Sequence, residues 1–327
     1  MAARTRYAPD RGLTVRMTAT MFLLGLVFVA FIAAIIGIGT AYNASDAAIV
    51  LFAVVLGGGF AIGSLFYSDK IALRTAGARE VTPQEAPELH GIVDRLCALA
   101  DMPKPRIAVA PARLPNAFAT GRNAKNSVLC VTDGLLSHSG LTQEELEGVL
   151  AHELSHVAHK DVQVMTYASL LAIVAGLLVR FAFYSELFGG GRGRGGNNGN
   201  AALLIPLIML ASAVVYAISF LLIRLLSRYR ELAADRSGAL LTQNPSALIS
   251  ALRKVSGSMN AIPKQDLRAA EPLNTFYFAP AMRLHGEGGG GLSALFSTHP
   301  SLEKRIEQLE KIQRELGQVG PDPRGLR

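Results

Sequence analysis

The sequence predicts a mainly α-helical integral membrane protein with a small β element, in which a water-exposed domain is joined to about four transmembrane helices. Half of its 327 residues are apolar, and its mean hydropathy of +0.31 is high for a water-soluble chain. Four long apolar runs recur along the chain, and polar segments with helix and strand signals lie between and after them. This alternation predicts several membrane crossings rather than a single anchor.

The first two apolar runs, residues 17–39 and 47–67, contain no charged residue. Each reaches the roughly 20 residues that a helix needs to cross a bilayer. A secretory signal is the rival interpretation of the first run, but its apolar region would usually span about 7–15 residues, so we expect an uncleaved anchor. Basic residues flank this pair on one side only, because residues 40–46 lack Lys and Arg. The positive-inside rule therefore places the N-terminus and residues 68–160 in the cytoplasm.

The third and fourth apolar runs cover residues 162–179 and 201–226. The Gly/Asn-rich loop between them, residues 189–200, carries two arginines on what would be the outer face. Because those arginines run against the positive-inside rule, a re-entrant pair is the alternative to two full crossings. The expected organisation is a transmembrane hairpin (1–67), a first cytoplasmic part (68–161), a second transmembrane or re-entrant hairpin (162–226), and a second cytoplasmic part with a C-terminal helix and a disordered tail (227–327).

The segment before the third run shows helix and strand signals. A capping box at Thr82–Glu85 predicts a helix over residues 83–100, and apolar stretches at 107–110 and 127–131 predict short buried strands. The stretch between these strands could form an edge strand that holds a peptide by main-chain hydrogen bonds, although an ordinary loop and strand would explain it equally well. The candidate substrate-binding residues there are Asn116, Ala117 and Phe118.

The chemistry centres on His152-Glu153-Leu154-Ser155-His156, an H-E-x-x-H pattern. A second capping box begins at Thr142 and predicts a helix over residues 143–160. Residues four apart share one face of a helix, so both imidazoles would point the same way, as Zn²⁺ ligands must. Glu153 could act as the general base toward the attacking water. The alternative is a helix with two incidental histidines on a solvated face.

Two histidines leave a catalytic zinc one protein ligand short. Glu231, just after the fourth apolar run, is the expected third ligand, and Asp235, one helical turn later, could accept the free ring N–H of a ligand histidine. Asp161 is the local rival as third ligand, and His159 lies at the wrong spacing for one. Without the histidine motif, Glu231 and Asp235 would be a solvated acidic pair that balances the neighbouring arginines.

These residues resemble the HtpX family of membrane-bound zinc metalloproteases, which is related to the CAAX prenyl endopeptidases. The resemblance rests on the His152–His156 motif, on Glu231-x-x-x-Asp235, on the stretch from Asn116 to Gly121, on Thr298-His299-Pro300, and on the four apolar runs around them. It implies a zincin-like domain with one Zn²⁺ per chain. It also implies a cytoplasm-facing endopeptidase of the plasma or inner membrane that removes misfolded or damaged membrane proteins. The Gly-rich stretches at 189–200 and 288–291 depart from the family pattern.

The C-terminal segment carries two further candidates. His299 and Arg305 could donate to the oxyanion that forms on the substrate. A helix-capping histidine and a surface arginine are the alternatives, because residues 302–316 carry an amphipathic helical stripe.

Composition and motifs narrow the remaining functions. The net charge of +7 is explained by basic residues beside the apolar runs, and the absence of a phosphate loop or dinucleotide fingerprint argues against a nucleic-acid or nucleotide partner. The expected partners are the lipid bilayer and membrane-protein or unfolded polypeptide substrates. The alternatives are a CAAX-type prenyl endopeptidase, which would have more than four spans, a non-catalytic membrane chaperone, for which Glu153 would be unnecessary, and a zinc transporter, whose ligands would lie inside the apolar runs.

Overall fold

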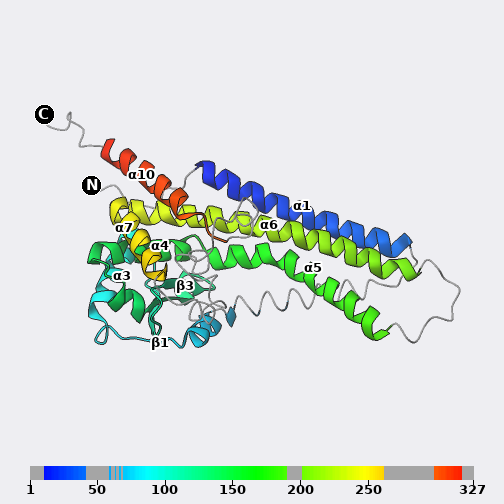
Figure 1. Cartoon of the computed structure of the whole chain (residues 1–327), viewed down its shortest axis with the longest axis horizontal. Coiled ribbons are helices and arrows are strands. Elements are labelled where there is room, and N and C mark those ends of the chain that lie inside the picture. The colour runs from blue at the N-terminus through cyan, green and yellow to red at the C-terminus, as the bar shows by residue number, and fades with distance from the viewer. Residues whose placement is uncertain are drawn as a thin grey trace. The chain divides into compact units, whose positions relative to one another are not determined.

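The computed structural model describes residues 11–41, 69–189, 201–260 and 298–318, together with residues 59, 63, 66 and 67. Figure 1 follows the elements along the chain from blue to red. The chain divides into two compact units: the first comprises Met1–Thr14, Phe66–Gln163 and Ser227–Arg327, and the second comprises Val15–Leu65 and Val164–Leu226. Two long helices, α5 (Asp161–Gly189) and α6 (Ala201–Thr242), contribute residues to both units.

The first unit is built from a sheet and the helices packed on it. Its strands are β1 (Arg79–Glu80), β2 (Arg106–Ala110), β3 (Ala117–Gly121) and β4 (Ser127–Thr132). Short helical turns, η1 (Ala124–Asn126) and η2 (Gly134–His138), precede and follow β4. Its longer helices include α3 (Pro87–Ala100), α4 (Gln143–Ala158), α7 (Pro245–Asn260) and α10 (Leu302–Gln318).

The described strands form one mixed sheet in the order β1-β2-β4-β3. Strands β2 and β4 are parallel, whereas β1 and β3 pair antiparallel with their neighbours. The expected strands at 107–110 and 127–131 are present as β2 and β4, and β3 lies at one edge. All six residues of β4 are buried, because its alternate side chains enter two different apolar clusters, one on each face of the sheet.

The main core lies on one face of the sheet, under α3, α4, α7 and α10. Leu150 and Leu154 of α4 meet Leu248 and Leu252 of α7, and all four side chains are fully buried. Each such leucine contributes about 1.5–3 kcal/mol of transfer free energy. This packing holds α4 firmly between the sheet and α7, so the side chains that α4 carries have a rigid support.

The helix expected over residues 83–100 begins later than the sequence signal suggests. The Thr82–Glu85 box does form, with the Thr82 amide donating to Glu85 Oε2 at 2.7 Å, but it closes an isolated turn, and α3 starts at Pro87. Proline disfavours the helical conformation in the residue before it, and Ala86 has φ −137° and ψ 63°. The expected start at residue 83 was therefore wrong, because Pro87 separates the turn from the helix.

In the second unit, α1 (Arg11–Ala41) packs with parts of α5 and α6. Phe31 and Ile35 of α1 meet Val174 and Leu178 of α5 in one buried cluster. Within the described residues, three helical segments are long and apolar enough to cross a membrane: Arg11–Ile35, Asp161–Arg180 and Pro206–Thr242. The expected run at 47–67 falls almost entirely outside the described residues, as do most of the loop at 189–200, the loop at 288–291 and the C-terminal tail.

Candidate metal centre

Helix α4 positions the H-E-x-x-H residues. Thr142 caps it through the expected capping box: its Oγ1 accepts from the Glu145 amide at 3.3 Å, and Glu145 Oε2 accepts from the Thr142 amide at 2.7 Å. The helix ends at Ala158, and Lys160 then adopts the left-handed φ of 57°. His152 and Glu153 are buried, with 1% and 4% of their surfaces exposed. They therefore lie inside the fold and not on a solvated face.

Helix α6 brings a carboxylate to both histidines. Glu231 Oε1 lies 3.5 Å from Nε2 of His156, and Glu231 Oε2 lies 3.7 Å from Nε2 of His152. Donor atoms of these three residues all lie within 4.8 Å of one another. The close approach of α6 to α4 depends on Gly238, since a Cβ there would stand 2.9 Å from the His152 amide nitrogen.

Each histidine also has a carboxylate at its other ring nitrogen. Asp235 Oδ1 lies 2.9 Å from Nδ1 of His152, and Asp161 Oδ2 lies 2.5 Å from Nδ1 of His156. An ionised carboxylate can only accept a hydrogen bond, so these positions favour the tautomer with the proton on Nδ1. Both Nε2 atoms then present lone pairs toward Glu231.

This donor set fits a metal ion. The two Nε2 atoms lie only 3.1 Å apart, and with both protons on Nδ1 no proton remains to bridge them. Two nitrogen lone pairs and the Glu231 carboxylate would repel one another there, and a divalent cation would remove that repulsion. Two imidazoles and one carboxylate are also a ligand set of catalytic zinc sites.

Burial keeps both imidazoles neutral. It lowers the pKa of His152 and of His156 to about 4, because a buried site disfavours the charged form. At neutral pH their lone pairs are therefore available to a metal without competition from protons.

The environment of Glu153 favours proton uptake. Burial first, and then the charge of Glu231, raise the pKa of Glu153 well above its ordinary value. The Ala119 amide of β3 donates a hydrogen bond to this carboxylate. Glu153 is thus a base with raised proton affinity, located between the metal cluster and the edge of the sheet.

The C-terminal segment adds His299 and Arg305 to the same site. His299 Nδ1 lies 3.0 Å from Glu231 Oε2. Arg305 is only 2% exposed, and it donates to Asp235 through Nε at 2.7 Å and through Nη2 at 2.6 Å. Its remaining Nη1 lies 4.0 Å from Glu231 Oε2. Because two guanidinium nitrogens donate to the two carboxylate oxygens of Asp235, Asp235 is the main partner of Arg305.

The candidate substrate-binding residues lie at the edge strand, but their side chains are buried. Asn116, Ala117 and Phe118 are 2%, 0% and 3% exposed. Phe118 belongs to the cluster on the sheet face away from α4. Only the main chain of this stretch is therefore suited to contact a substrate.

Sequence reasoning missed two features of the site. It considered Asp161 only as a ligand. It considered Arg230 as a basic flank of an apolar run or as a solvated charge beside Glu231 and Asp235, yet Arg230 is buried and contacts Asp161. A signal was available, because Asp161 closely follows His156 and Arg230 directly precedes Glu231. The third histidine of α4, His159, lies 3.2 Å from Ser237 Oγ and does not join the metal cluster.

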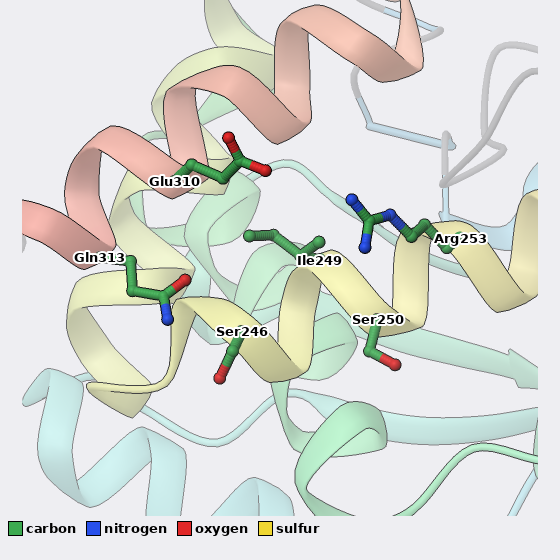
Figure 2. A pocket seen from close by; sticks show the side chains of 6 residues that line it. All are labelled: Ser246, Ile249, Ser250, Arg253, Glu310 and Gln313. Atoms are coloured by element: carbon green, nitrogen blue, oxygen red, sulfur yellow. The ribbon is translucent and has the colours of Figure 1, made fainter.

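A surface pocket between α7 and α10 lies apart from these residues. Figure 2 shows Ser246, Ile249, Ser250 and Arg253 of α7 on one side and Glu310 and Gln313 of α10 on the other. None of its lining residues belongs to the metal cluster, so this pocket is not the candidate site.

Comparison with known proteins gives consistent matches. The model of peptidase family M48 matches residues 83–313. Protease HtpX homolog 1 of Streptomyces coelicolor is 54% identical over 316 residues, which cover 97% of this chain and 98% of that protein. Protease HtpX homolog of Moorella thermoacetica is 48% identical over 314 residues, covering 96% and 98%. Among solved structures, S. mikatae Ste24p matches with a TM-score of 0.53 at 18% identity over 90% of this chain and 67% of that one, a likeness of fold alone.

Proposed function

This chain belongs to peptidase family M48, among the HtpX-type metalloproteases, and from that premise we propose that it is a membrane-embedded zinc endopeptidase that cleaves misfolded or damaged membrane proteins on the cytoplasmic side. The observation that carries the proposal is the convergence of His152, His156 and Glu231 beside a buried Glu153. If His152, His156 and Glu231 only stabilised the fold through their charges, a carboxylate at the position of Glu153 would not be needed.

The proposed cofactor is one Zn²⁺ per chain, held by His152, His156 and Glu231. Bound zinc acts as a Lewis acid on the substrate carbonyl and lowers the pKa of water at the site. Asp235 holds His152 through Nδ1, which fixes the tautomer that leaves Nε2 available.

The other polar residues take separate roles in the proposal. Glu153 takes the proton of the attacking water and later gives it to the leaving amine, for which its raised pKa is suited. His299, at 3.0 Å from Glu231, is the candidate donor to the oxyanion. For Arg305 the geometry favours a different role from the oxyanion donor that the sequence suggested: its fork on Asp235 keeps that carboxylate oriented toward His152.

The substrate backbone would lie along the edge of β3 away from β4, which pairs with no other strand in the described part of the chain and is called the open edge below. The carbonyl oxygen of Asn116 already accepts a main-chain hydrogen bond from the amide of Thr132 in β4. Antiparallel pairs alternate between bonded and non-bonded residues, so Ala117 and Ala119 direct their main-chain groups to the open edge. The donation from the Ala119 amide to Glu153 agrees with this alternation. A peptide on this edge would run next to the proposed base.

The membrane setting supports the substrate class. Three described segments are apolar and long enough to cross a membrane. The basic residues beside the apolar runs favour a cytoplasmic position for the first unit described above, which is called the peptidase unit below. The partners would be the bilayer and membrane-protein or unfolded polypeptide chains, without nucleic acid. The fold likeness to Ste24p does not by itself favour a prenylated substrate.

Cleavage of casein by the purified full chain in detergent, with and without a chelator, tests the activity. Glu153→Gln should retain stoichiometric zinc but lose turnover by about 100-fold or more, since general-base catalysis supplies roughly that factor. Glu147→Gln is the matched control, because Glu147 lies on the same helix and pairs with Arg95 at the surface. Near-parental turnover in zinc-loaded Glu153→Gln would remove Glu153 from this role. Zinc bound by a parent chain without any proteolysis would favour a non-catalytic chaperone.

A further inference from the structure

The partly exposed side chain of His156 contacts two buried residues in succession, Asp161 and Arg230, and a zinc site does not need both of them as ligands. Its Nδ1 is 2.5 Å from Asp161 Oδ2, and the other Asp161 oxygen contacts the Arg230 guanidinium. Asp161 is 8% exposed and Arg230 is 3% exposed. Burying an ion pair carries a desolvation cost, so its position against a ligand histidine calls for an explanation.

The turn after α4 is what brings Asp161 to His156. At about 100° per residue, a residue five positions further along an uninterrupted helix would point about 140° away from His156. Lys160, with φ 57°, breaks the helix, and α5 then begins at Asp161. The change of backbone direction at Lys160 leaves the Asp161 carboxylate against the ring of His156.

The same arrangement occurs at the other histidine. His152 Nδ1 meets Asp235, and Asp235 is held by Arg305. Each imidazole thus contacts a carboxylate, which in turn contacts a buried arginine. Asp161 of α5 and Arg230 of α6 form the first set, and Asp235 of α6 and Arg305 of α10 form the second. In both, the carboxylate is at Nδ1, on the opposite side of the ring from the Nε2 atoms that converge on Glu231.

We propose that Asp161, supported by Arg230, is a positioning residue that fixes the tautomer and ring orientation of His156 for metal binding, and is not itself a ligand. The inference rests on the proposed metal centre. Arg230 contacts the Asp161 oxygen that does not face His156, which holds the carboxylate in place and ties the first residue of α5 to α6 within the first unit. Neither residue contacts the substrate in this role.

Binding of Zn²⁺ and Co²⁺ to the full chain in detergent tests the proposal. Asp161→Asn should bind Zn²⁺ about 10–100-fold more weakly in competition with a chromophoric chelator, the usual loss when a partner of a ligand histidine is changed. The visible spectrum of bound Co²⁺ should change with the altered His156 geometry. Because Asp161→Asn leaves a buried arginine without its partner, the double variant Asp161→Asn/Arg230→Gln removes both charges and should restore the thermal stability of the metal-free chain without restoring the affinity.

Asp69→Asn is the matched control, since Asp69 forms an ion pair with Arg106 at 2.6 Å elsewhere in the same unit. It should bind both metals as the parent does. Parental Zn²⁺ affinity and an unchanged Co²⁺ spectrum in the double variant would overturn the inference and leave the pair a purely structural role. A parent chain that binds neither metal stoichiometrically would instead overturn the proposed metal centre, and this inference with it.

Discussion

The three carboxylates around the proposed metal centre fall into two groups, according to whether they approach the Nε2 or the Nδ1 atom of a histidine. Glu231 lies near both Nε2 atoms, whereas Asp235 and Asp161 each meet an Nδ1. A group near Nε2 can share a metal with the histidine, while a group at Nδ1 can only orient the ring. Three carboxylates of similar chemistry should therefore respond differently to substitution.

Glu231→Ala should largely abolish stoichiometric zinc, because it removes a ligand oxygen. Asp235→Asn should weaken zinc binding or activity by about 10–100-fold, because it removes only the charge that holds His152. Metal content of the purified variants, measured by atomic emission, distinguishes the two. If Glu231→Ala binds zinc like the parent and Asp161→Ala does not, the carboxylate next to α4 is the ligand and the assignment of Glu231 is wrong.

At the scale of elements, the site depends on how closely α6 approaches α4. The two helices meet at Gly238, whose missing side chain lets the His152 backbone come near. Strand β3 also contacts α4, and its Ala119 amide reaches Glu153. Helix packing therefore sets the distance between the proposed ligands, and the sheet edge would set the distance from Glu153 to a peptide bound there.

Gly238→Ala should destabilise the protein and weaken metal binding together. The added Cβ would stand 2.9 Å from the His152 amide nitrogen and 3.1 Å from its Cα, so α6 must shift, at a cost of about 1–3 kcal/mol. Gly257→Ala in α7 is the matched control: outside the neighbouring backbone of its own helix, no atom of the described residues lies within 4 Å of its added Cβ, and helix propensity should add up to about 1 kcal/mol of stability. Thermal unfolding and zinc titration measure both. Equal behaviour of the two variants would show that the close approach is not needed.

Peptide substrates methylated at successive backbone nitrogens test the open edge of β3. A strand bound there exchanges main-chain hydrogen bonds at every second residue. Methylation away from the scissile bond should therefore lower kcat/KM by about 3–10-fold at alternate positions, which corresponds to the net free energy of one hydrogen bond. The intervening positions serve as the control, because their nitrogens face away from β3. A loss that is the same at every position would rule out strand addition.

At the scale of the whole molecule, the peptidase unit is assembled from segments on both sides of the second pair of apolar runs in the sequence. Helix α6 alone has 42 residues, about 63 Å at 1.5 Å per residue, which is about twice the thickness of the hydrocarbon core. Its first part belongs to the second unit, and its last part, from Ser227, belongs to the first. One continuous helix thus carries both apolar surface and a proposed metal ligand.

A reporter fused after Arg79 should read as cytoplasmic, because basic residues flank the first two apolar runs on one side only. A reporter inserted within residues 189–200 should read as external if the third and fourth runs both cross. A cytoplasmic signal there would favour a re-entrant pair instead. An external signal after Arg79 would reverse the orientation of the peptidase unit.

The sequence by itself determined what depends on neighbours along the chain. Short-range geometry sets the capping box at Thr142, the four-residue spacing of His152 and His156, and the lengths of the apolar runs. It also sets the place of β3 along the chain, after β2 and before β4. The capping-box signal at Thr82 predicted the wrong helix start, because the residue before Pro87 is not helical and the helix begins only at Pro87.

The sequence suggested Glu231 and Asp235 as partners of the histidines, but only the tertiary structure decided at which ring atoms and distances these distant groups meet. Glu231 reaches His156 across 75 positions of sequence, and Arg305 reaches Asp235 across 70. Such contacts depend on helix packing distances, here limited by Gly238, and no periodicity along the chain encodes them. The same holds for Asp161: its spacing made it a rival ligand, but the turn at Lys160 places its carboxylate at the opposite nitrogen of His156, because the direction of the chain after a helix end determines which side of a ring a neighbour can reach.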